Sequence, residues 1–385
     1  RDYYASRGLG DVYKRQGALK LMSKILIFTN HSYMLYRFRL ELIQELKKAH
    51  EVVLSMPFVG HEDDFKALGI RCIETSVDRR GLNPKTDLQL LLRYWKLLRQ
   101  EQPDLVITYS IKPNIYAGLC CRAAGIPYCA NVQGLGTAFQ KPGLAQFVSI
   151  LYRSALKDAR TVFFENECNA EEFRKRKITP ANQQTVLPGA GINLEHYSYV
   201  PYPNHDAVHF LYLGRIMKEK GIDELFAAMQ QLNRAYGNRV ILDLVGFYDD
   251  DFYQRQVDEL VSAGIAVFHG FQTDPLPYYA STDCVVLPSY HEGMSNVLLE
   301  AAAIGRPVIT SNIPGCREAV EHEKTGLLCT VKDTKSLYEQ MRHMVTIPIA
   351  ERSAMGQAAH EKMVREFDKR NVVSATIAAA LGLAQ

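Results

Sequence analysis

Short apolar runs alternate with longer segments of helical periodicity through most of the chain. In the first half the runs predict strands over residues 24–29, 51–56, 104–109, 127–132 and 161–166. Helices are predicted over residues 38–49, 88–100, 115–124 and 147–156. Strands that alternate with helices in this way predict a parallel sheet with helices on both faces.

The alternation pauses over residues 197–209, where two prolines and several turn-forming residues indicate a linker. It resumes with strands predicted over residues 210–214, 240–246, 266–270, 284–289 and 307–310. The predicted fold class is therefore α/β, with two doubly wound, Rossmann-like domains that face each other across a cleft. We expect an N-terminal domain over residues 22–196 and a C-terminal domain over 210–348. The helices over 349–385 could pack on either domain, including back on the N-terminal one.

The first residues look foreign to this pattern. Residues 11–16, DVYKRQ, read like a translated transposon-end adapter, and Met22 then opens an ordinary start. The segment has neither the apolar core nor the cleavage site of a signal peptide. We expect residues 1–21 to be a non-native or disordered leader.

Composition narrows the class of protein. The 385 residues carry a net charge of +3, which is too mild to indicate a nucleic-acid partner. The apolar runs are shorter than the ~18 residues that a membrane-spanning helix needs. The eight cysteines form no CxxC pair and no metal-ligand spacing. These observations predict a cytoplasmic protein without a metal site.

A carboxylate stands inside an apolar helix of the second half. The predicted helix begins near Ser295 or Asn296, either of which could cap it, and residues 305–307 end it. Glu300 is the only charged residue between 297 and 304, and Glu292 lies eight positions before it. A buried carboxylate is costly without partners. Two adjacent ligand hydroxyls, as on a ribose, would be suitable partners for Glu300, and the alternative is that it pairs with an arginine or caps a backbone group.

The start of the same helix predicts an anion site. The backbone amides at a helix N-terminus attract negative charge, and here they should point into the cleft. They belong to Gly293, Met294, Ser295 and Asn296.

A second cluster follows the strand at 210–214, which ends at Gly214. Arg215 and Lys220 come directly after it. Arginine can hold two phosphate oxygens at once, and lysine adds a mobile point charge. A solvated basic loop is the alternative, but cations, carboxylates and a helix N-terminus at matching strand ends favour a diphosphate site.

These motifs resemble those of a known family. The segment EGMSNVLLE, with Glu292 and Glu300, is similar to the E-x7-E motif of glycosyltransferase family four, and GRIMKEKG, with Arg215 and Lys220, is similar to its phosphate-binding segment. Three segments of the first half resemble a branch that extends undecaprenyl-diphosphate-linked sugars and includes N-acetylgalactosaminyl and other hexosaminyl transferases: DRRGLNP (78–84), ITYSIKPNIYAG (107–118) and NVQGLGTAF (131–139).

The resemblance implies a GT-B fold, a UDP-sugar donor, retention of anomeric configuration and no essential metal or other cofactor. Arg215 and Lys220 would stabilise the departing diphosphate, Glu300 would hold the ribose, and Glu292 would hold hydroxyls of the donor sugar. The four amides and Gly214 would lie alongside the donor. The implied partner is a lipid-linked or polysaccharide acceptor of cell-surface glycan synthesis, such as capsule or lipopolysaccharide. The implied location is cytoplasmic, with peripheral contact to the inner face of the plasma membrane.

The acceptor side departs from the family's commonest pattern. The first loop lacks a glycine pair, and residues 108–114 contain no histidine. Their places at strand ends make His31, Lys112 and Asn114 candidates, although a lone loop histidine is more often merely exposed. Gly134 and Gly136 are expected to shape a tight loop near the acceptor, or else a simple turn.

Three other segments each allow two interpretations, one functional and one structural. YDDD at 248–251 imitates an Asp-x-Asp metal motif, but a solvated acidic loop fits better. Residues 144–160, with Lys141, and residues 86–100, with Trp95, could rest on an anionic membrane or be core helices.

Two rival functions stay open at this level. One is a non-hydrolysing UDP-sugar 2-epimerase on the same fold. The other is a sugar-nucleotide-binding protein without catalysis.

Overall fold

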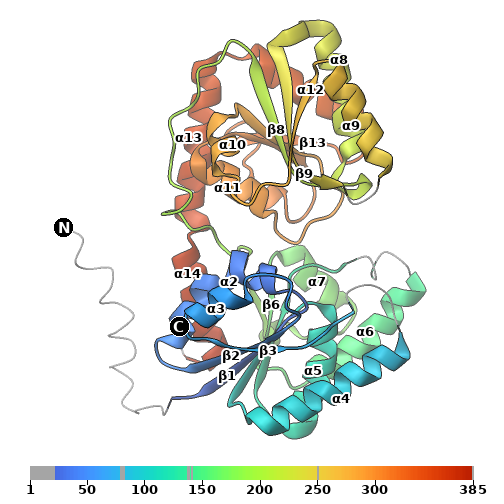
Figure 1. Cartoon of the computed structure of the whole chain (residues 1–385), viewed down its shortest axis with the longest axis vertical. Coiled ribbons are helices and arrows are strands. Elements are labelled where there is room, and N and C mark those ends of the chain that lie inside the picture. Colours follow the sequence, from blue (N-terminus) through green and yellow to red (C-terminus); the bar gives the residue numbers. More distant parts are fainter. Residues whose placement is uncertain (1–21, 79–82, 137–138, 140–141, 249–250, 384–385) are drawn as a thin grey trace, which may run out of the picture.

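The computed structural model describes residues 22–78, 83–136, 139, 142–248 and 251–383, and arranges them in two α/β domains (Figure 1). Two predicted segments lie outside the described ranges: the leader over residues 1–21, and residues 79–82 of the segment DRRGLNP. The fold class is the one that the sequence predicts.

The N-terminal domain contains a parallel sheet of seven strands among the described residues. Their spatial order is β3 (Arg71–Glu74), β2 (Glu51–Met56), β1 (Lys24–Phe28), β4 (Leu105–Tyr109), β5 (Tyr128–Val132), β6 (Thr161–Phe164) and β7 (Gln184–Val186). The helices are α2 (Ser32–Lys47), α3 (Glu62–Ala67), α4 (Pro84–Glu101), α5 (Ile111–Ala124), α6 (Pro142–Leu156) and α7 (Glu167–Lys175).

Side chains of the central strand β1 show why this sheet is covered on both faces. Leu26 and Phe28 join the apolar layer that includes residues of α4, α5 and α6, whereas Ile25 and Ile27 join the layer that includes α2. Successive side chains of a strand point to opposite faces, so an unbroken apolar run needs helices on both sides.

The C-terminal domain repeats this topology with six described strands. Their order is β10 (Ala266–Gly270), β9 (Val240–Tyr248), β8 (Val208–Ile216), β11 (Cys284–Leu287), β12 (Val308–Ser311) and β13 (Gly326–Cys329), all parallel. The helices are α8 (Ile222–Tyr236), α9 (Phe252–Ser262), α10 (Leu276–Ser281), α11 (Asn296–Ile304) and α12 (Thr334–Thr346). The strand order changes direction beside β8 and β11, which is where doubly wound sheets bind ligands.

The two last helices divide between the domains. Helix α13 (Ile349–Glu366) packs on α11 of the C-terminal domain, whereas α14 (Lys369–Leu381) packs on α2 of the N-terminal domain (Figure 1). Both arrangements that the sequence left open therefore occur, since α14 packs back on the N-terminal domain and α13 does not. The expected linker is also too long, because β8 begins at Val208.

The chain passes between the two domains twice, and the two connecting segments lie side by side. The amide of Ile192 donates to the carbonyl of Phe367 at 2.7 Å, and the amide of Lys369 donates to the carbonyl of Ile192 at 3.0 Å. This short parallel pairing ties the crossing at 187–207 to the turn between α13 and α14.

Candidate functional site

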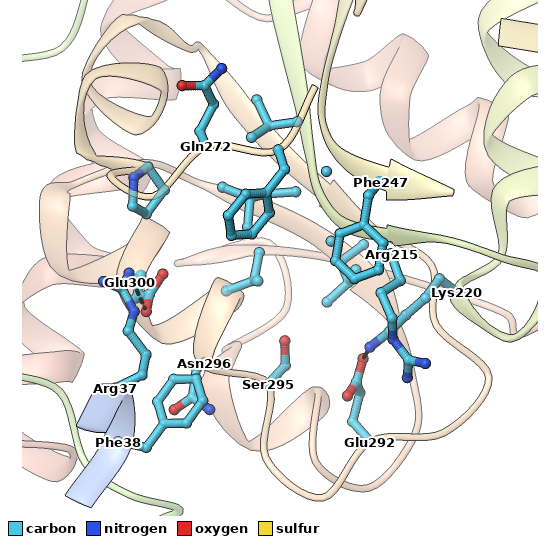
Figure 2. Close-up of a pocket in the computed structure, with 18 of the residues that line it drawn as sticks. Arg37, Phe38, Arg215, Lys220, Phe247, Gln272, Glu292, Ser295, Asn296 and Glu300 are labelled. Carbon is cyan, nitrogen blue, oxygen red and sulfur yellow. Dashed lines mark hydrogen bonds and ion pairs between the residues drawn. The ribbon is translucent and has the colours of Figure 1, made fainter. Parts of the chain in front are cut away.

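A cavity of about 420 Å³ lies where the two domains face each other (Figure 2). From the C-terminal domain its wall includes most of the predicted donor residues, namely Gly214, Arg215, Lys220, Glu292, Met294, Ser295, Asn296 and Glu300. From the N-terminal domain the wall includes Tyr33, Arg37 and Phe38, all on α2. The structure thus brings both predicted clusters to one place.

Lys220 and Glu292 form an ion pair at one end of the cavity. The Lys220 Nζ lies 2.5 Å from Glu292 Oε1, and the Ser289 hydroxyl donates to the same oxygen at 2.7 Å. Gly221 makes this approach possible, because a β-carbon there would lie 2.1 Å from the carbonyl oxygen of Pro288 and its φ is +72°. A glycine is therefore required where the loop after β8 meets the loop after β11.

The N-terminus of α11 differs in detail from the prediction. Ser295 is the N-cap residue, but its side chain makes no capping hydrogen bond. The Ser295 amide donates to the carbonyl of Gly315 at 2.9 Å, so it is not free for an anion as predicted. Among the described residues, the amides of Met294 and Asn296 donate no hydrogen bond, and these two residues line the cavity.

Gly293 contacts the other domain instead of lining the cavity. A β-carbon at this position would lie 1.6 Å from the carbonyl oxygen of Gln133 in the N-terminal domain. The Asn166 side chain donates to the Gly293 carbonyl at 2.5 Å. Gly293 therefore allows the loop before α11 to close against the N-terminal domain.

The Glu300 carboxylate lies at the other end of the cavity from Lys220 (Figure 2). Its Oε2 accepts a hydrogen bond from the Tyr279 hydroxyl at 2.9 Å, and its Oε1 lies 3.5 Å from a guanidinium nitrogen of Arg37. Burial raises the pKa of this carboxyl, while Arg37 and the hydroxyls of Tyr279 and Tyr197 oppose the shift. The alternative that Glu300 faces an arginine is confirmed, and its role toward ribose hydroxyls stays a prediction.

A second, mostly buried carboxylate, which the sequence analysis did not predict, lies close to Gly293. Glu165 follows β6, accepts a hydrogen bond from Arg39 at 2.7 Å, and has its Oε2 3.1 Å from the place of a Gly293 β-carbon. Burial raises the pKa of Glu165 to about 7, although Arg39 opposes this.

Several other residues of the cavity were not predicted. Gly246 and Phe247 lie near the carboxyl end of β9, Gln272 follows β10, and Arg37 comes from α2. The two β9 residues follow the same strand-end rule that identified Gly214, so they could have been found. Arg37 gives no such signal, because it lies in the second turn of a helix in the other domain.

The acceptor-side candidates divide into two groups. Lys112, Asn114 and Gly134 line a second cavity of about 230 Å³ at the carboxyl ends of β4 and β5. His31 and Gly136 are not among the described residues that line these two cavities, so the structure does not support them as acceptor-site candidates. Gly136 has a φ of +68°, which fits the simple-turn alternative.

The Asn114 side chain is committed to the fold. It is fully buried, accepts from the Thr108 hydroxyl at 2.6 Å and donates to the Asn131 carbonyl at 2.8 Å. Lys112 pairs with Asp87 at 2.8 Å. The Lys112 side chain is thus also held by a contact within the N-terminal domain.

Two expectations concern metal and membrane. In the described ranges no group of three or more His, Cys, Asp or Glu side chains is arranged to hold a metal ion. Residues 249 and 250 of the YDDD segment lie outside those ranges. Among the described helices, none combines the length and the apolar character needed to cross a membrane.

Comparison with known proteins defines the class. The family model "Glycosyl transferase 4-like domain" matches residues 37–190, and the model "Glycosyl transferases group 1" matches residues 207–346. The two matches cover the two domains in turn. The chain belongs to glycosyltransferase family four and is a glycosyltransferase of the GT-B fold.

Individual relatives extend this picture. An N,N'-diacetylbacillosaminyl-diphospho-undecaprenol alpha-1,3-N-acetylgalactosaminyltransferase of Campylobacter jejuni is 28% identical over 326 residues, which are 80% of this chain and 85% of that protein. A UDP-Gal:alpha-D-GlcNAc-diphosphoundecaprenol alpha-1,3-galactosyltransferase of Escherichia coli is 26% identical over 82% of this chain and 83% of that protein. Among solved structures, Anabaena HepE in complex with UDP and glucose matches with a TM-score of 0.76 and 17% identity, over 94% of this chain and all of that chain.

Proposed function

We propose that this glycosyltransferase moves a sugar from a UDP-sugar to an undecaprenyl-diphosphate-linked acceptor, with retention of anomeric configuration. The observation that carries the proposal is that Arg215, Lys220, Glu292, Glu300 and the start of α11 line one cavity between the domains. The undecaprenyl-linked substrates in the names of the two relatives support the acceptor class. Neither the family models nor the relatives described above support the epimerase alternative.

In this proposal the diphosphate replaces Glu292 as the ionic partner of Lys220. Lys220 and Glu292 neutralise each other in the structure. A bound diphosphate would become the partner of Lys220, and Glu292 would then be free to accept hydrogen bonds from hydroxyls of the donor sugar. Arg215 and the amides of Met294 and Asn296 would contribute further positive potential at the phosphates.

Catalysis in this site would be mainly electrostatic. As the sugar leaves, negative charge grows on the diphosphate, and Arg215 and Lys220 would stabilise it. Glu300 at the other end of the cavity would hold the ribose. The proposal involves no essential metal, because the two cations supply the charge that a metal would otherwise supply.

Thermal shift with nucleotides tests the donor site. A ligand that binds only the folded state stabilises it by about 2.7 kcal/mol at a hundredfold excess over Kd. We expect UDP to raise the melting temperature by several degrees, with or without EDTA, and GDP and ADP to raise it less. Arg215→Ala should abolish the shift, whereas Lys218→Met, an exposed cation of the same loop that does not line the cavity, should keep it. No response of the wild type to UDP would overturn the proposal.

We also propose that α4 and α6 rest on the membrane that carries the acceptor. Leu88 and Leu92 on α4, and Phe147 and Ile150 on α6, are each about half exposed. Both helices pack on α5, which lies between them (Figure 1). Lys85, Lys96 and Arg99 add positive charge along α4, which suits an anionic surface. Lys141, which the sequence reading included, lies outside the described residues.

Sedimentation with vesicles that contain about a third phosphatidylglycerol tests this contact. We expect the wild type to bind and the double variant Leu92→Glu with Ile150→Glu to bind at least tenfold more weakly, because both changes remove exposed apolar surface and add negative charge. The control is Val267→Glu, which changes an exposed apolar residue of the C-terminal domain. Equal binding of the double variant and the control would contradict the proposal.

A further inference from the structure

Arg37 is a residue of the N-terminal domain that reaches into the donor side of the cleft. It lies on α2, and its side chain is 23% exposed. Its guanidinium donates to the hydroxyl of Tyr197 in the crossing segment and lies 3.5 Å from Glu300 Oε1 on α11. Figure 2 shows Arg37 and Glu300 together at the end of the cavity opposite Lys220 and Glu292.

The contact with Arg37 favours the ionised form of the buried Glu300 carboxyl. Arg37 is the only cation among the described residues within 4 Å of this carboxylate. The other groups that face it are the hydroxyls of Tyr279 and Tyr197 and, more distantly, Lys369 of α14. Burial disfavours the ionised form of a carboxyl, and a nearby cation restores it. An ionised carboxylate can accept hydrogen bonds on both oxygens, whereas a protonated one loses part of that capacity.

The geometry leaves room for a ligand. A close charge-assisted hydrogen bond measures about 2.7–2.9 Å, so the 3.5 Å between Arg37 and Oε1 is loose. Oε2 is already fixed by Tyr279. Oε1 is therefore the oxygen that a ligand hydroxyl would approach, with Arg37 beside it.

We propose that Arg37 is a positioning residue for the donor, which holds the Glu300 carboxylate charged and oriented for the ribose hydroxyls. The inference rests on the proposed function, which assigns the ribose to Glu300. Because α2 and α11 belong to different domains, this support exists only while the domains are closed. Donor affinity is thereby coupled to closure of the cleft.

A direct contact between Arg37 and the diphosphate is the competing explanation. The two explanations differ in what must be present for Arg37 to matter. A positioning role needs both the Glu300 carboxylate and the ribose hydroxyls. A phosphate contact needs neither.

The test is a double-mutant cycle measured by isothermal titration calorimetry with UDP and 2′-deoxy-UDP. The proteins are the wild type, Arg37→Met, Glu300→Gln and the double variant, with Lys47→Met as a control cation at the exposed end of the same helix. We expect Arg37→Met to weaken UDP about tenfold and 2′-deoxy-UDP less than threefold. In the Glu300→Gln background the Arg37 change should have little further effect, and Lys47→Met should bind UDP like the wild type.

Loss of UDP affinity of the same size with and without Glu300, or with both nucleotides, would overturn the inference in favour of a phosphate contact. Unchanged UDP affinity of Arg37→Met would overturn it as well. Arg37→Lys should recover part of the lost UDP affinity, because lysine restores the positive charge, although it lacks the guanidinium that also donates to Tyr197. Such a recovery would show that the loss in Arg37→Met is not caused by a fold defect. Absence of UDP binding by the wild type would instead refute the proposed function itself.

Discussion

Replacing Lys220 with methionine is expected to lower the rate constant of sugar transfer by about 10²–10³-fold, with a smaller change in donor affinity. Lys220 is held at the cavity by the loop that Gly221 allows to approach Pro288, and its Nζ lies 2.5 Å from Glu292. In the proposed reaction its charge matters most when the diphosphate departs. The substitution also leaves Glu292 without its partner, which places an uncompensated negative charge beside the phosphates.

Lys218→Met is the matched control for this variant. Lys218 lies in the same short 3-10 turn, Lys218–Lys220, and has the same charge, but it is exposed and does not line the cavity. Steady-state rates of both variants at saturating donor give the comparison. Similar losses in the two variants would show that the loop's general charge matters and not the position of Lys220.

Replacing Arg306 with methionine should lower the free energy of unfolding of the C-terminal domain by about 3–5 kcal/mol. Arg306 is fully buried and donates to the carbonyls of Tyr279, Ala280, Val200 and Pro201 at 2.8–3.1 Å. These bonds tie the crossing segment to α10, beside the start of β12. Methionine fills similar space but removes the arginine donor from all four carbonyls, which is the costly part of the change.

Two spectroscopic signals can locate this loss. Trp95 is the only tryptophan and lies on α4, so its fluorescence follows unfolding of the N-terminal domain, whereas circular dichroism follows both domains. In urea, Arg306→Met should shift the transition seen by circular dichroism to lower concentration much more than the transition seen by fluorescence. Arg342→Met, which removes an exposed pair with Glu339, should change stability by less than ~1 kcal/mol. An Arg306→Met curve that matches this control would contradict the account.

The strands inside the two sheets could be predicted from sequence, whereas three of the four described edge strands were missed. β1, β4 and β11 are apolar runs because helices cover both of their faces. β3 (RCIE) and β7 (QTV) lie at the two edges of their sheet and are only partly buried, so no apolar run marks them. The short edge strand β13 (GLLC) was missed although it is apolar and mostly buried, whereas the edge strand β10 was predicted as residues 266–270.

The candidate site could be predicted where strand ends and motifs mark it. Glu292, Glu300, Arg215 and Lys220 come together because the carboxyl ends of β8 and β11 are neighbours in one sheet. Arg37 could not be found in this way, because its position depends on how the two domains pack. Hydrogen bonds fixed by the fold also escaped the prediction, as with the Ser295 amide and the Asn114 side chain.

The most direct test of the central claim is sugar transfer to a lipid-linked acceptor. Purified protein would be incubated with radiolabelled UDP-sugars, including UDP-N-acetylgalactosamine and UDP-galactose, and with polyprenyl-diphosphate-linked N-acetylhexosamine, and the labelled lipid would be measured. We predict label in the lipid fraction from at least one UDP-sugar, without added metal, and a loss of about 10²–10³-fold with Lys220→Met. Transfer that Lys220→Met leaves intact, or conversion of a UDP-sugar to its epimer without any acceptor, would contradict the account.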